Sequence, residues 1–160
     1  MKKIMIIFAA LFCASAPVFS VQVGASQFSK YKNLLKDKRV ALVANATSVI
    51  PHSDGTKTHD LDFLIHNNIN VTKIFAPEHG FRGEQEGGKT IKNDVDPKTG
   101  VQIISLYGQN VKPTKESLAD IDIVVYDIQD VGTRFYTYIS TMHYVMEACA
   151  ENNIPLVIFD

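Results

Sequence analysis

The sequence predicts an α/β fold, a Rossmann-like domain whose mostly parallel sheet is flanked by helices. Short runs of apolar, often β-branched residues recur along the chain, as expected for strands that are buried on both faces. Segments with a helical spacing of apolar residues separate most of these runs. Strands that alternate with helices favour a parallel sheet, because each helix carries the chain back across one face. The 160 residues are enough for one such domain with its own core.

Five strands are expected from the apolar runs. The first is almost continuously apolar, and the second ends at Pro77, which has no N–H to donate to a sheet. The segment 47–57 is rich in Ser, Asp, Gly and Pro and predicts a loop, while 83–99 lacks any apolar period and predicts a long surface loop. The expected strands are residues 39–45, 71–76, 101–106, 121–126 and 155–159.

Four helices are expected between the strands, at residues 31–35, 58–68, 114–120 and 133–152. In the last helix Asp130 or Thr133 is expected to cap the N-terminus, and Gly132 to permit the turn that precedes it. One face of this helix is predicted to pack on the sheet. That face consists of Phe135, Ile139, Met142, Met146 and Cys149.

Residues 1–20 predict a secretory signal peptide. Lys2 and Lys3 precede an apolar run at 4–12 and then small residues, and cleavage is expected after Ser20. The apolar run is too short to cross a bilayer as a helix. We therefore expect a periplasmic or secreted protein that keeps no stable membrane anchor after cleavage, with residues 21–160 as the mature domain.

The composition of this mature segment excludes several classes of protein. It holds 14 basic and 17 acidic residues, a formal charge of −3, without any block of basic residues, so nucleic acid is not an expected partner. Cys149 is its one cysteine, so no disulfide can form within the segment. Its stability must come from a packed core.

The first candidate site follows the second predicted strand. Glu78, His79 and Arg82 lie within five residues of one another, and Gly80 and Gly83 allow tight turns between them. In open α/β sheets, ligands bind at the carboxyl ends of the strands. Glu78 and His79 are therefore candidate catalytic residues.

A second candidate site follows the fourth predicted strand. Its polar residues are Asp127, Gln129, Asp130, Arg134 and Tyr136, more than the capping of a helix requires. Asn45, Glu78, Asp127 and Asp160 each come at the end of a predicted strand, so their side chains are expected to converge on one edge of the sheet. Carboxylates, amides and tyrosines with few lysines suit a polyhydroxylated ligand, and glycoside hydrolysis commonly uses a pair of carboxyl groups.

Two other chemistries are not supported. Residues 83–90 match the phosphate-binding pattern G-x-x-x-x-G-K-[ST], but no amphipathic helix follows, and Glu84 and Glu86 would repel phosphates. His52, His59, His79, Asp127 and Asp130 are possible metal ligands, but their spacing fits no known motif. We expect neither a cofactor nor a metal.

The sequence resembles a family of bacterial peptidoglycan exo-β-N-acetylmuramidases (NamZ-like), formerly known only as a domain of unknown function. The segments that carry the resemblance are residues 77–83, 96–100 leading into 105–108, and 126–138. The resemblance implies release of terminal N-acetylmuramic acid from peptidoglycan fragments, and an N-terminal Rossmann-like catalytic domain followed by an auxiliary domain. It also implies that Glu78 is the catalytic residue.

With this resemblance, we expect His79 to assist Glu78, and muropeptides and other peptidoglycan fragments to be the partners. The substrate contacts are expected from Asn45, Arg82, Asp127, Gln129, Asp130, Arg134 and Tyr136. Because the family's chains are much longer, we expect this chain to be the N-terminal part of a longer protein and to be inactive by itself. A module that binds a cell-wall sugar without cleaving it is the alternative, suggested by Tyr107, Tyr136 and Tyr138.

Overall fold

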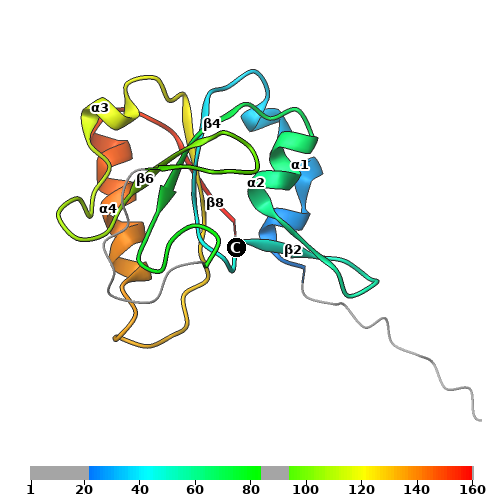
Figure 1. Cartoon of the computed structure of the whole chain (residues 1–160). Coiled ribbons are helices and arrows are strands. Elements are labelled where there is room, and N and C mark those ends of the chain that lie inside the picture. The colour runs from blue at the N-terminus through cyan, green and yellow to red at the C-terminus, as the bar shows by residue number, and fades with distance from the viewer. Residues whose placement is uncertain (1–21, 84–93, 160) are drawn as a thin grey trace, which may run out of the picture.

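The computed structural model describes residues 22–83 and 94–159, and the main feature of this part is a six-stranded sheet with the order β5-β6-β4-β1-β7-β8 (Figure 1). Five of the strands run parallel, and the short β5 pairs antiparallel with β6 at one edge. The strands of this sheet are β1 (Val40–Ala44), β4 (Val71–Ala76), β5 (Asp94–Val95), β6 (Gln102–Ser105), β7 (Ile123–Asp127) and β8 (Leu156–Ile158). This confirms the predicted α/β fold.

Helices cover both faces of the sheet. One side carries α1 and α2, and the other carries α3 and α4 (Figure 1). The short helix η1 precedes α1. The helices are η1 (Gly24–Ser26), α1 (Phe28–Leu35), α2 (Asp60–His66), α3 (Lys115–Leu118) and α4 (Tyr138–Glu151).

The central strand β1 divides the core into two layers. All five of its residues are fully buried. Leu42 packs with Tyr31 and Leu64 on the α1 and α2 side, while Val43 packs with Val145 on the α4 side. A strand buried on both faces is apolar throughout, which explains why its position was predictable from the sequence.

The chain order of the strands changes direction beside β1. From β1 the chain proceeds to β4 and β6 on one side, and then returns to β7 and β8 on the other. The order therefore reverses between β1 and β7, and ligands of such folds bind outside the carboxyl ends of the strands at this reversal.

The prediction for α4 was wrong in its start and in three of the five residues of its buried face, while Met142 and Cys149 do pack against the core. The helix begins at Tyr138, five residues later than predicted, and Phe135, Ile139 and Met146 are 95%, 52% and 46% exposed. Residues 133–137 are not helical. Counting the helical spacing from Phe135 therefore assigned the wrong residues to the buried face. The buried residues are Tyr138, Thr141, Val145, Ala148 and Cys149.

The predicted cap of α4 was also wrong. Thr137 is the N-cap and makes no side-chain capping bond, while the Asp130 carboxylate accepts a hydrogen bond from the Gly132 N–H at 3.0 Å. Gly132 has a φ of 71°, so the predicted glycine turn is confirmed. Asp130 therefore stabilises the loop before the helix, as aspartate often does in turns.

Three further strands lie in segments predicted as loop or helix. Residues 47–57 contribute to an antiparallel hairpin of β2 (Val49–Pro51) and β3 (Lys57–His59), so α2 begins at Asp60, two residues after the predicted start. β5 lies within the predicted loop 83–99. All three strands are too short to show a periodic pattern in the sequence.

Some expectations concern residues outside the described part of the chain. These are the signal peptide at residues 1–20, most of the phosphate-loop pattern at 83–90, and Asp160. Among residues 22–83 and 94–159, no helix has the length and hydrophobicity needed to cross a membrane.

The corrected face of α4 predicts a contrast between neighbouring residues. Val145→Asp buries a carboxylate in the core and is expected to lower the free energy of unfolding by about 3 kcal/mol or more. Met146→Asp changes a half-exposed side chain and is expected to cost less than about 1 kcal/mol. Urea unfolding measures both, and equal losses would show that the face is misassigned.

Candidate active site at the carboxyl edge of the sheet

Three of the predicted site residues follow three neighbouring strands. Asn45 follows β1, Glu78 follows β4, and Asp127 ends β7. β1 pairs with both of the other strands in parallel, so the three residues lie at the same edge of the sheet. The expected convergence of these three is confirmed.

A tight turn carries Glu78. The Gly80 N–H donates a hydrogen bond to the Pro77 carbonyl at 3.2 Å, and His79 has a φ of 73°. A positive φ at the third residue of a turn normally requires glycine or asparagine. His79 therefore holds a strained backbone conformation next to the candidate catalytic carboxylate, as is common at functional sites.

The rest of the turn segment is anchored by Phe81 and Arg82. Phe81 is buried, with its ring 4.6 Å from the His59 ring. Arg82 donates two hydrogen bonds to Asp96, at 2.7 and 2.9 Å, and lies 3.2 Å from Asp62 of α2. These contacts give Arg82 a structural role in holding the loop, and its predicted contact with substrate stays a prediction.

Gly83 completes the anchor by a close approach to the loop after β1. Its φ is 75°, and a Cβ on this residue would lie 2.9 Å from the Cβ of Ala46. A larger residue would push the two loops apart. The glycine thus keeps the segments after β4 and β1 side by side.

Ion pairing determines the charge state of this anchor. The Arg82 guanidinium holds the pKa of Asp96 down at about 2, and the Asp96 and Asp62 carboxylates raise the pKa of Arg82. Thr99 adds two hydrogen bonds to Asp96, from its N–H and its hydroxyl. Asp96 is therefore an ionised carboxylate although its side chain is only 1% exposed.

Glu78 faces a small hollow of about 150 Å³. The carboxylate interacts with the Tyr107 hydroxyl and raises the pKa of that phenol. Glu78 is half-buried, while the His79 beside it is exposed. The hollow is lined by Glu78, His79, Phe135, Tyr136, Thr137 and Tyr138.

A larger cavity of about 610 Å³ lies at the ends of β1, β7 and β8. Asp127, Gln129 and Asp130 line it together with Thr47 and Tyr138. The ligand contacts expected of the first three residues stay predictions. Tyr138 also lines the Glu78 hollow. The two spaces therefore share a wall.

Asn45 supports this edge through hydrogen bonds with Thr47. Its side chain is buried, and its Oδ1 accepts hydrogen bonds from the Thr47 N–H at 2.9 Å and the Thr47 hydroxyl at 2.7 Å. Burial raises the pKa of the Tyr138 phenol, and the Asn45 amide partly offsets this effect. Asn45 is thus placed to orient Thr47 and Tyr138.

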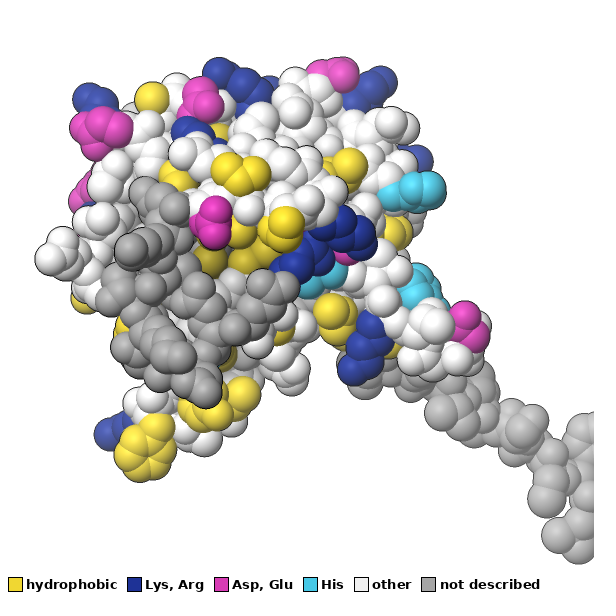
Figure 2. Space-filling model, in the orientation of Figure 1, with side chains coloured by type: hydrophobic (Ala, Val, Ile, Leu, Met, Phe, Trp, Pro, Cys, Tyr) yellow, Lys and Arg dark blue, Asp and Glu magenta, His cyan; other side chains and the backbone are white. Residues whose placement is uncertain are grey.

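The segment between β7 and α4 protrudes from the molecule (orange, lower left of Figure 1). Figure 2 shows hydrophobic side chains exposed there, and Phe135 is 95% exposed. Arg134 is exposed. The ring centroids of Tyr136 and Tyr138 lie 5.8 Å apart, and the two rings are tilted relative to each other. The contacts predicted for Arg134 and Tyr136 stay predictions.

The sequence did not reveal Asp60, which is buried beneath this edge and 1% exposed. Burial and the neighbouring Asp127 carboxyl raise the pKa of Asp60 to about 9. An aspartate at the start of a helix ordinarily indicates a favourable contact with the helix dipole. Nothing in the sequence distinguishes a buried residue from an exposed one at that position.

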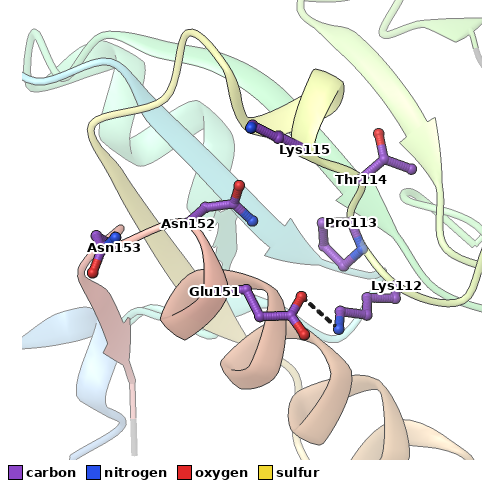
Figure 3. A pocket seen from close by; sticks show the side chains of 7 residues that line it. All are labelled: Lys112, Pro113, Thr114, Lys115, Glu151, Asn152 and Asn153. Carbon is purple, nitrogen blue, oxygen red and sulfur yellow. Dashed lines mark ion pairs between the residues drawn. The ribbon is translucent and has the colours of Figure 1, made fainter.

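Another cavity, of about 630 Å³, lies away from this edge, beside the C-terminal end of α4 (Figure 3). Lys112 pairs there with Glu147 at 3.0 Å and Glu151 at 2.8 Å. Since α4 leads into β8, this cavity lies at the amino ends of the strands. It does not include the predicted site residues.

Within residues 22–83 and 94–159, no group of three or more acidic, histidine or cysteine side chains is arranged to hold a metal ion.

The anchor predicts an acid-sensitive stability. Asp96→Asn is expected to lower the free energy of unfolding at pH 7 by about 1–3 kcal/mol, because a charged hydrogen-bond acceptor is lost. Since the pKa of Asp96 is depressed when folded, its contribution should disappear as the pH falls from about 4 towards 2. Denaturant unfolding at several pH values measures this, and an unchanged acid profile in the variant would contradict it.

The strained turn predicts a difference between two substitutions of His79. Glycine tolerates a φ of 73° and alanine does not, so His79→Gly is expected to be more stable than His79→Ala by about 1 kcal/mol. Thermal or urea unfolding of the two variants measures the difference. Greater stability of the alanine variant would show that the turn is not strained.

The chain is similar in sequence to a known protein family. The family model described as Exo-beta-N-acetylmuramidase NamZ, N-terminal, matches residues 40–160. The peptidoglycan beta-N-acetylmuramidase NamZ of Bacillus subtilis (strain 168) is 47% identical over 131 residues, which cover 81% of this chain and 31% of that protein.

Two crystal structures of DUF1343 family proteins from Bacteroides fragilis are also similar. One has a TM-score of 0.76 and 40% identity, covering 87% of this chain and 34% of its own. The other has a TM-score of 0.72 and 43% identity, covering 89% and 35%. The chain thus spans about a third of the length of the relatives it matches. It belongs to the NamZ exo-β-N-acetylmuramidase family and corresponds to the N-terminal part of that family.

Proposed function

We propose that this chain supplies the Glu78-bearing part of an exo-acting glycoside hydrolase that releases terminal N-acetylmuramic acid from peptidoglycan fragments. The observation that carries the proposal is the placement of Glu78, half-buried in a hollow at the carboxyl edge of the sheet and held there by the anchored turn. Family membership supports the reaction, since the Bacillus subtilis relative is named as a peptidoglycan beta-N-acetylmuramidase.

The chemistry assigned to Glu78 is proton transfer at the glycosidic bond. A glycosidase acid donates a proton to the departing oxygen, or a carboxylate activates the attacking water. The Tyr107 hydroxyl interacts with Glu78, and His79 adjoins it, so both can influence the proton on the carboxyl group. Asp127 and Gln129 line the adjoining cavity, where their oxygen atoms can accept hydrogen bonds from sugar hydroxyls.

The cellular setting belongs to the same proposal. The signal-like residues 1–20 favour a periplasmic or secreted protein that acts where cell-wall fragments occur. Muropeptides and other peptidoglycan fragments are the proposed partners.

The catalytic role of Glu78 is tested with Glu78→Gln in the protein of full natural length. The amide preserves the shape of the side chain but cannot transfer the proton, so kcat on a chromogenic N-acetylmuramic acid glycoside should fall about a hundredfold or more. Glu116→Gln is the matched control, because it makes the same substitution at an exposed glutamate of α3, away from the candidate site. Wild-type turnover by Glu78→Gln would remove this residue from the mechanism.

A binding module without hydrolysis is the second candidate. The tilted pair of Tyr136 and Tyr138 beside the exposed Phe135 favours it, because aromatic faces pack on sugar rings. Calorimetry with a muropeptide, followed by analysis of the mixture for free N-acetylmuramic acid, separates the two functions. Binding without any product would support the module, and product would support the enzyme.

A further inference from the structure

The carboxyl group of Asp60 has no ordinary hydrogen-bond donor around it. It is 1% exposed, and neither of its oxygens meets a donor among the described residues. An ionised carboxylate in such a place costs several kcal/mol unless it is paired. The polar group that interacts with Asp60 is the carboxyl of Asp127, at the end of β7, and it raises the pKa of Asp60.

The neighbouring side chains that could donate are committed elsewhere. The two ring nitrogens of His59 are both used, with Nε2 on the Asn45 carbonyl at 3.0 Å and Nδ1 accepting from the Leu61 N–H at 3.2 Å. This pattern places the ring proton on Nε2 and leaves the imidazole neutral. Burial also lowers the pKa of His59, so the ring supplies no positive charge to Asp60.

Tyr31 and Ser48 are likewise occupied. The Tyr31 hydroxyl donates to the Ala25 carbonyl at 2.6 Å, and the Ser48 hydroxyl donates to the backbone carbonyl of Asp127. Tyr31 and Asp127 are the titratable groups that interact with Asp60, and burial together with both carboxyl groups raises the pKa of Tyr31. None of these groups can stabilise a negative charge on Asp60.

We propose that Asp60 keeps its proton at neutral pH and donates it in a hydrogen bond to the Asp127 carboxylate. One side of Asp127 is then fixed from within the core, and its remaining lone pairs face the cavity that it lines. Asp60 is a positioning residue, since its own oxygens are buried. An acceptor oxygen held in this way favours ligand hydroxyl or N–H donors. This step rests on the proposed function as a sugar hydrolase.

The protonation of Asp60 is tested without any substrate, in the protein of full natural length. Difference infrared spectroscopy at neutral pH should show a protonated carboxyl band that Asp60→Asn removes. Asp127→Asn should shift this band, because the acceptor of the hydrogen bond changes. Asp96→Asn is the matched control, since Asp96 is equally buried but ionised, and it should leave the band in place. No band, or a band unaffected by Asp60→Asn, would overturn the proposal.

Stability against pH gives a second test of the same proton. A pKa raised to about 9 in the folded protein means that the unfolded chain releases this proton at a much lower pH. The free energy of unfolding should therefore fall as the pH rises from about 4 to 9, and Asp60→Asn should flatten this fall. An equally steep fall in the variant would contradict a proton held on Asp60.

The positioning role is tested by ligand binding. Asp60→Leu removes the donor and should weaken binding of N-acetylmuramic acid about tenfold or more, whereas Asp60→Asn restores a donor and should recover most of the affinity. Equal loss in both variants would overturn positioning through a hydrogen bond. If the wild-type protein does not bind the sugar, the proposed function fails while the infrared and pH results still decide the state of Asp60.

Discussion

The ion pair between Arg82 and Asp96 is the contact on which the geometry of the candidate site depends. Glu78 lies in a turn whose next residue, His79, has a φ of 73°, and such a conformation persists only when the surrounding structure holds it. Arg82 supplies that hold, because its two bonds to Asp96 and its contact with Asp62 tie the turn to α2 and to the segment after β5. A carboxylate on an unanchored turn would have no fixed position relative to β1 and β7.

Two buried aspartates with the same exposed fraction carry opposite charge states in this small domain. Asp96 and Asp60 are both 1% exposed. Asp96 meets a guanidinium and the hydrogen-bond donors of Thr99, which favour the ionised form. Asp60 lies beside another carboxyl group, and the nearby Tyr31 hydroxyl already donates its hydrogen bond to a backbone carbonyl. This environment favours the neutral form of Asp60. The partner, rather than the depth of burial, decides the charge.

The sequence predicted the sheet and the edge at which Asn45, Glu78 and Asp127 lie, because both depend on local patterns. Continuous apolar runs identify strands buried on both faces, and Pro77 identifies where β4 ends, so the positions of Glu78 and Asp127 followed from the chain alone. The partners of Arg82 could not be predicted, since Asp62 and Asp96 are 20 and 14 residues away. Part of the buried face of α4 was missed because the apolar spacing was counted from Phe135, which lies outside the helix.

The sizes of the two spaces at the edge limit how a sugar can be held. Small-molecule sites usually measure about 300 Å³ or more, so a hollow of about 150 Å³ at Glu78 holds only part of a saccharide. The adjoining cavity of about 610 Å³ is large enough, and Tyr138 belongs to both. A ligand whose scissile bond reaches Glu78 must therefore gain most of its contacts outside the hollow. In the proposed hydrolysis, the orientation of Asp127, which lines the larger cavity, therefore affects how the ligand is presented to Glu78.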